Sequence, residues 1–134
     1  MSARGKLTLE WLAVSIGGAM GAVLRHTLAS AITVQLKSEF PLGIFTVNVL
    51  GCFLMVICYV LLVERQLLGD PWLDFTLAGL LGAFTTFSTF SIQAYMLIVN
   101  GRRALALGYI MASVLVCLLA VAVGVFLTRT LINH

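Results

Sequence analysis

Charged side chains are scarce in this chain of 134 residues, in which aspartate, glutamate, lysine and arginine together account for 10% and hydrophobic residues for 61%. The mean hydropathy is +1.11. A domain folded in water is typically about 25% charged, because its surface must be polar. The shortage of charge excludes a water-soluble fold and favours an integral membrane protein.

Side chains that build catalytic or metal centres are also few. The chain has three cysteines and two histidines, and the cysteines lie inside apolar stretches. They lack the paired spacing of a zinc site or a disulfide framework. No nucleophile stands in a pattern with a base, so we expect no enzyme. The eight basic residues are scattered along loops and helix ends, which disfavours a nucleic-acid footprint.

Four long apolar stretches are present, and each can cross a hydrocarbon core of about 30 Å as a helix of about 20 residues. We therefore expect an all-α integral membrane protein with a single transmembrane domain over residues 1–134. Asp70 and Pro71 predict the start of the third helix, as its N-cap and its first turn. The predicted helices cover residues 9–34, 41–63, 71–99 and 103–130.

The third stretch carries the clearest functional pattern. Its length of about 30 residues corresponds to about 45 Å of helix, more than a bilayer core needs. A run of hydroxyl and phenyl side chains follows Gly79 and Gly82, and irregular backbone at membrane depth is tolerated only where it is buried in protein or lines a cavity. We therefore expect this helix to break mid-membrane near residues 82–88. Carbonyls at such a break suit a small hard cation, whereas N–H groups at a half-helix start suit an anion. The run is Thr85, Thr86, Phe87, Ser88, Thr89, Phe90, Ser91.

Polar side chains in the first two stretches each leave two interpretations open. Arg25 either draws anions into a vestibule or extends its cation to the membrane surface. Asn48 either bonds to a neighbouring helix or donates its amide N–H to an ion in a pore. Gly17 and Gly21 share a helix face, which favours close packing between helices.

Phe87 and Phe90 share a face if the second half-helix has begun, and the electropositive edges of their rings can contact an anion. Contact with lipid or with the core is the alternative. Tyr109, Ser113 and Cys117 recur every four residues on the fourth helix. They either line a hydrated track or bond across to another helix.

Basic residues are nearly balanced between the two sides of the predicted membrane domain. The positive-inside rule therefore gives almost no preferred orientation. Two possibilities stay open. The chain either inserts in both orientations, which would give an antiparallel dimer, or inserts in a single orientation. The two sets are Arg4, Lys6, Arg65 and Arg129 on one side, and Lys37, Arg102 and Arg103 on the other, with Arg25 near the second.

Three sequence blocks together carry a family resemblance. The blocks are Gly17-Gly18-x-x-Gly21-x-x-x-Arg25, Gly43-x-x-Thr46-Val47-Asn48-x-x-Gly51 and Gly82-x-x-Thr85-Thr86-Phe87-Ser88-Thr89-Phe90-Ser91. Over nearly its whole length the chain resembles the Fluc (CrcB-type) fluoride channel family. The resemblance implies a passive, fluoride-selective channel in a bacterial inner membrane, which exports fluoride from the cytoplasm to relieve its toxicity. It also implies a dual-topology homodimer with two antiparallel pores and a structural sodium ion at its centre.

The same resemblance implies roles for individual residues. The backbone carbonyls of Gly82 and Thr85 would hold the sodium ion. The implied fluoride pathway comprises Asn48, Phe87, Thr89, Phe90, Tyr109 and Ser113, and Arg25 would line the vestibule. Three positions depart from the family pattern and bear on conduction rate and pore polarity: Gln93 replaces a frequent Glu, Ile44 a frequent Thr, and Cys117 a frequent Ser.

Two other functions compete with this interpretation. A proton-coupled drug exporter with four helices needs a titratable carboxylate inside the bundle, and the acidic residues of this chain fall in termini, loops and helix ends. An assembly subunit that transports nothing would not need a polar break in the third stretch. The acidic residues are Glu10, Glu39, Glu64, Asp70 and Asp74.

Overall fold

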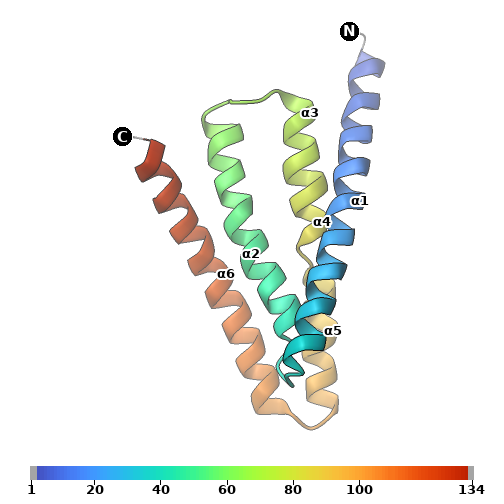
Figure 1. Cartoon of the computed structure of the whole chain (residues 1–134), viewed down its shortest axis with the longest axis vertical. Coiled ribbons are helices and arrows are strands. Elements are labelled where there is room, and N and C mark those ends of the chain that lie inside the picture. Colours follow the sequence, from blue (N-terminus) through green and yellow to red (C-terminus); the bar gives the residue numbers. More distant parts are fainter. Residues whose placement is uncertain (1–2, 133–134) are drawn as a thin grey trace.

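The fold is a bundle of long helices (Figure 1). The structure, a computed structural model, describes residues 3–132, and the two residues at each end of the predicted domain lie outside that range. All regular structure in the described range is helical, with four spans long and apolar enough to cross a membrane, which confirms the predicted all-α class and the four predicted spans. The elements are α1 (Ala3–Leu36), α2 (Leu42–Tyr59), the π-helical η1 (Val60–Glu64), α3 (Asp70–Leu73), the π-helical η2 (Asp74–Leu81), α4 (Gly82–Phe84), α5 (Phe87–Val99) and α6 (Arg103–Ile132).

Ion pairs join the spans at both ends of the bundle. The ends of α1 and α6 that carry the chain termini lie beside the connection between η1 and α3, and the other two connections lie at the opposite end (Figure 1). At the terminal end Lys6 Nζ lies 2.7 Å from Asp70 Oδ2, and Arg129 Nη2 lies 2.7 Å from Glu64 Oε1. At the opposite end Arg102 pairs with Glu39. Such exposed pairs contribute little to stability, because water screens their attraction.

The start of the third span corrects one sequence prediction. Gly69, in extended conformation with ψ 174°, is the N-cap of α3, and Asp70 is already the first helical residue. The Asp70 carboxylate does not cap the helix, because it pairs with Lys6 of α1 instead. The first span also begins earlier than predicted, at Ala3 rather than near residue 9.

Small residues bring α1 against the first half of the third span. A Cβ atom at Gly17 would overlap the carbonyl oxygen of Phe75, and one at Gly21 would overlap that of Leu80. A Cβ atom at Gly79 would lie only 2.9 Å from the Val14 carbonyl oxygen. In lipid, helices associate through such close packing, because burial from water no longer drives them together. The glycine face predicted from the sequence is therefore the surface that positions η2.

The third span is interrupted at two residues. Helix α4 ends at Phe84, and α5 begins at Phe87. Between them Thr85 has φ −82° and ψ 155°, and Thr86 has φ −151° and ψ 118°, which are extended conformations. The interruption falls inside the range 82–88 that the sequence predicts. The π-helical η2, which α4 separates from the interruption, changes the hydrogen-bond register, as is common near functional sites.

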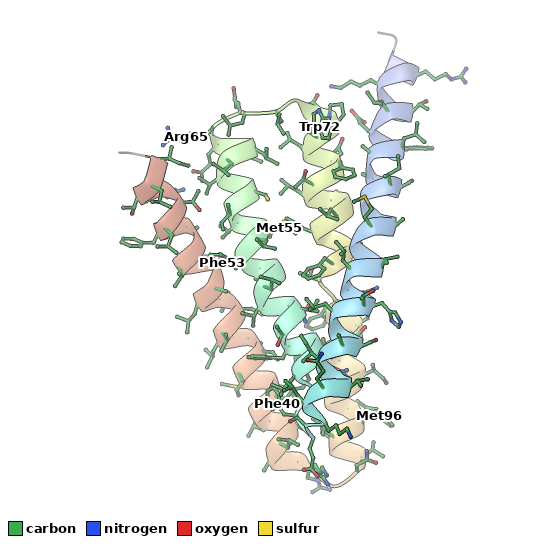
Figure 2. The ribbon with its side chains drawn as sticks, in the orientation of Figure 1. Phe40, Phe53, Met55, Arg65, Trp72 and Met96 are labelled. Atoms are coloured by element: carbon green, nitrogen blue, oxygen red, sulfur yellow. The ribbon has the colours of Figure 1, made fainter. Side chains whose placement is uncertain are left out.

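Buried side chains gather where α2, α5 and α6 meet. Much of the outer surface stays apolar, as a membrane environment requires. Figure 2 shows Arg65 and Trp72 at the terminal end of the bundle and Phe40 at the opposite end. The buried cluster contains Ile44, Phe90, Ala94, Leu97, Ala106 and Tyr109.

Substitution of Gly21 tests the packing of α1. We expect Gly21→Ala to lower the free energy of unfolding by about 1–3 kcal/mol, because the added methyl group must displace the backbone of the neighbouring helix. Thermal unfolding in detergent measures the change. Gly108→Ala is the matched control, since a Cβ atom there meets nothing within 4 Å. Equal stability of the two variants would contradict the packing role.

Candidate functional site

Asn48 of α2 binds the interrupted backbone through two hydrogen bonds. The backbone N–H of Thr86 donates to Asn48 Oδ1 at 2.8 Å, and Asn48 Nδ2 donates to the Thr86 carbonyl oxygen at 3.1 Å. One side chain thus satisfies both polar groups of a residue that has left the helix. The amide has two N–H groups, and this arrangement uses one of them. Of the two interpretations open for Asn48, bonding to a neighbouring helix is therefore confirmed.

Thr86 also starts the second half of the span. Its side chain is the N-cap of α5, where Oγ1 accepts from the Thr89 backbone N–H at 3.2 Å. The same Oγ1 donates to Thr89 Oγ1 at 3.1 Å and lies 3.2 Å from Ser88 Oγ. Sequence reasoning missed this role. A threonine directly before an apolar helical pattern is a recognised start signal and would have indicated it.

The first turn of α5 directs backbone donors toward the interruption. The first N–H groups of a helix have no acceptor within the helix, and Thr86 takes that of Thr89. The N–H groups of Phe87 and Ser88 remain at the positive end of the helix dipole. Such a terminus attracts negative charge.

The structure brings the two predicted phenyl rings together. The ring centroids of Phe87 and Phe90 are 5.4 Å apart, with an interplanar angle of 47°. Phe90 is buried against Tyr109, at a centroid distance of 5.2 Å, whereas Phe87 is 78% exposed within the single chain. Phe90 therefore has protein on both sides, and Phe87 forms an open wall.

A cavity of about 260 Å³ lies beside the interruption. No charged side chain lines it. Ser113 of α6 is 5% exposed, and its buried hydroxyl has no hydrogen-bond partner among the described residues. A buried polar group without a partner costs free energy, so this hydroxyl is available to bind a ligand or water. The lining residues are Asn48, Cys52, Thr85, Thr86, Phe87, Phe90, Ser113, Val114 and Cys117.

A second, wider cavity of about 440 Å³ is lined by residues of α1, α2 and α5. It contains Arg25, so the predicted vestibule residue does face an open volume. Thr89, which the resemblance placed on the pathway, lines this cavity rather than the first one. The full lining is Arg25, His26, Ala29, Ser30, Thr33, Val34, Ile44, Thr89 and Gln93.

Tyr109 connects the walls of the two cavities but lines neither of them. Its side chain is completely buried, and its ring packs on Phe90 of the first cavity. Its hydroxyl donates to Oε1 of Gln93, which lines the second cavity, at 3.0 Å. Gln93, a departure from the family pattern, therefore determines where this hydroxyl points.

The interruption also changes the hydrogen bonding of the backbone carbonyls. In a continuous helix the Thr86 N–H would donate to the Gly82 carbonyl, but it donates to Asn48 instead. The Thr85 N–H and hydroxyl both donate to the Leu81 carbonyl, at 3.1 and 3.2 Å. The Gly82 carbonyl thereby loses its usual donor. Backbone oxygens of this kind fit a hard cation such as sodium, and residues 3–132 contain no cluster of three or more His, Cys, Asp or Glu for one.

Known proteins match the chain along most of its length. The family described as "CrcB-like protein, Camphor Resistance (CrcB)" matches residues 12–125. The fluoride-specific ion channel FluC of Saccharophagus degradans is 46% identical over 91% of both chains. That of Hahella chejuensis is 42% identical over 89% of this chain and 94% of its own, and that of Magnetococcus marinus is 40% identical over 92% and 98%.

These similarities confirm the resemblance drawn from the three sequence blocks. They also agree with four apolar spans and exclude an enzyme, because the family consists of ion channels. The chain is a multi-pass membrane protein that belongs to the CrcB-like family.

Proposed function

We propose that the chain is a passive channel for fluoride, which exports the ion from the bacterial cytoplasm across the inner membrane. The observation that carries the proposal is the unpartnered, buried hydroxyl of Ser113 in an uncharged cavity beside Asn48 and two phenyl rings. Fluoride is a small acceptor without a donor of its own, so it fits a site whose uncharged polar groups can donate to it. The relatives are named as channels specific for the same ion.

The cavity stabilises an anion through several weak donors. Burial of an isolated ion in an apolar medium would cost tens of kcal/mol, so no single group is sufficient. The Ser113 hydroxyl, the second N–H of the Asn48 amide and the edges of the phenyl rings can act together. Because none of them is charged, the ion is held weakly enough to leave again, which conduction requires.

The pathway begins at the wider cavity. There the Arg25 guanidinium raises the local concentration of anions, and the hydroxyls of Ser30 and Thr89 can replace part of the hydration shell. Tyr109 and Gln93 stand between this vestibule and the Ser113 cavity. The ion then passes the phenyl edges and moves down its gradient without any proton transfer.

The proposal includes an antiparallel homodimer with two pores and both interrupted spans at mid-membrane. Its support is the nearly balanced distribution of basic residues and the exposure of Phe87, whose ring leaves one wall of the cavity open within a single chain. A second copy in the opposite orientation would cover that wall. The carbonyls of Gly82 and Thr85 from both copies would hold a sodium ion, which would neutralise backbone charge at the dimer centre.

A proton-coupled exporter fits the same cavities poorly. Such a protein needs a carboxylate that binds and releases protons within the bundle, and neither the vestibule nor the Ser113 cavity is lined by one. The carboxylates of Glu39, Glu64 and Asp70 instead form ion pairs at the bundle ends.

Ion efflux from reconstituted vesicles tests the proposed function. Liposomes that carry the purified chain are loaded with potassium fluoride or potassium chloride, and an ion-selective electrode records efflux after valinomycin provides a path for potassium. We expect rapid release of fluoride, retention of chloride, and no release without valinomycin, because a passive channel moves net charge. Release of both anions, or of neither, would reject a selective channel.

Isoleucine substitutions test the phenyl edges. We expect Phe87→Ile and Phe90→Ile each to lower fluoride flux by at least about tenfold, which corresponds to about 1.4 kcal/mol, while the dimer remains intact in gel filtration. Phe126→Ile is the matched control, since this ring is 69% exposed on α6 and lines neither cavity. Unchanged flux in the first two variants would remove the rings from the pathway.

Substitutions of Asn48 and Ser113 distinguish an effect on stability from an effect on conduction. We expect Asn48→Ala to lower both fluoride flux and the free energy of unfolding, the latter by about 1–3 kcal/mol, because it leaves the Thr86 N–H without an acceptor and removes a donor to the Thr86 carbonyl. Ser113→Ala should lower flux while stability stays the same or rises, since its hydroxyl has no protein partner to lose. Flux and thermal unfolding of the same preparations measure both. A loss of stability in Ser113→Ala would show that its hydroxyl serves the fold.

A further inference from the structure

Two cysteine side chains from neighbouring helices meet inside the Ser113 cavity. Cys52 of α2 and Cys117 of α6 both line it, and the two thiols lie close enough to interact. Both are free thiols in the structure. Close packing of α2 on α6 supports the contact from the terminal side, where a Cβ atom at Gly124 would overlap the Val56 side chain.

The thiol pair lies on the proposed ion path. Cys52 follows Asn48 by four residues, and Cys117 follows Ser113 by four, so each thiol is one helical turn beyond a proposed fluoride donor. Helices α2 and α6 run in the same direction (Figure 1), so each thiol lies one turn further along the same direction from its donor. Cys52 also lines a further cavity of about 270 Å³. Cys52 is therefore shared by the two cavities, and Cys117 faces it from the first.

We propose that Cys52 and Cys117 form a two-thiolate site for a soft, two-coordinate metal cation, and that a cation bound there closes the fluoride path. Thiolates select soft cations such as Cu(I), Ag(I) and Hg(II), whereas hard cations prefer oxygen. With Hg(II) the reaction is Hg²⁺ + 2 RSH → Hg(SR)₂ + 2 H⁺, in which two metal–sulfur bonds form and two protons leave. No electron is transferred.

Closure follows from the position and the chemistry of the site. The metal bridge ties α2 to α6 across the cavity, and it takes up the volume next to Asn48 and Ser113. The proposed closure of the path rests on the proposed function, because closure is measured as a loss of fluoride flux. The proposed metal binding by the two thiols is independent of that function.

Mercuric ion serves as the probe in vesicles that contain the purified chain. We expect micromolar Hg(II) to stop fluoride efflux of the unmodified protein, and Cys52→Ser and Cys117→Ser each to need at least about tenfold more metal for the same effect. Rates are expressed relative to each variant without metal. Cys58→Ser is the matched control and should stay fully sensitive, because Cys58 lies on α2 but outside the cavity.

Intact-mass measurement after addition of one equivalent of Hg(II) per chain tests binding without any transport. We expect one mercury per chain with the loss of two protons in the unmodified protein and in Cys58→Ser, and no bridged species when either Cys52 or Cys117 is replaced. A bridge that survives in those variants, or a block that persists when both thiols are replaced, would overturn the site. If the unmodified chain conducts no fluoride, the proposed function fails, while the mass measurement still decides the metal site.

Discussion

The pair of hydrogen bonds between Asn48 and the Thr86 backbone is the interaction on which the site depends. A span that leaves helical geometry exposes N–H and carbonyl groups, and an apolar environment offers them no water. Asn48 supplies one acceptor and one donor to the same residue. Thr86 is thereby held in extended conformation, its hydroxyl caps α5, and the Gly82 carbonyl loses its usual donor. The cavity, the helix start and the candidate cation oxygens all follow from one amide.

In the proposed function, a membrane protein with so little charge must stabilise an anion without a fixed cation in the narrow site. The Ser113 cavity distributes partial positive charge over a hydroxyl, an amide and two ring edges, none of which has to be ionised in the membrane. A fixed cation would bind fluoride more tightly and would itself be costly to bury. Arg25, the one arginine that lines a cavity of the pathway, faces the wider vestibule rather than the narrow site. The arrangement favours passage over tight binding.

The sequence correctly predicted those features that depend only on residues close together in the chain. The four apolar spans follow from hydropathy, and the interruption follows from a run of hydroxyls after two glycines, so both were predicted. It was wrong for the N-cap at Asp70, because Lys6 of a distant helix takes the carboxylate and Gly69 provides the extended residue. It left two interpretations of Asn48, since one amide can serve both a helix and an ion. It missed Thr86 as an N-cap, although the signal was present.

The amino-acid sequence by itself determined the membrane class, the number of spans, the place of the interruption and the family, because these depend on composition, on runs of neighbouring residues and on short motifs. Only the tertiary structure decided which side chains meet. Asn48 and Thr86 are 38 residues apart and Tyr109 and Gln93 are 16 apart, and each pair forms only once the helices have packed. Cys52 and Cys117 likewise come to line one cavity only when α2 and α6 have packed. The distances between helices depend on glycine contacts and side-chain packing throughout the bundle, which no local pattern in the chain contains.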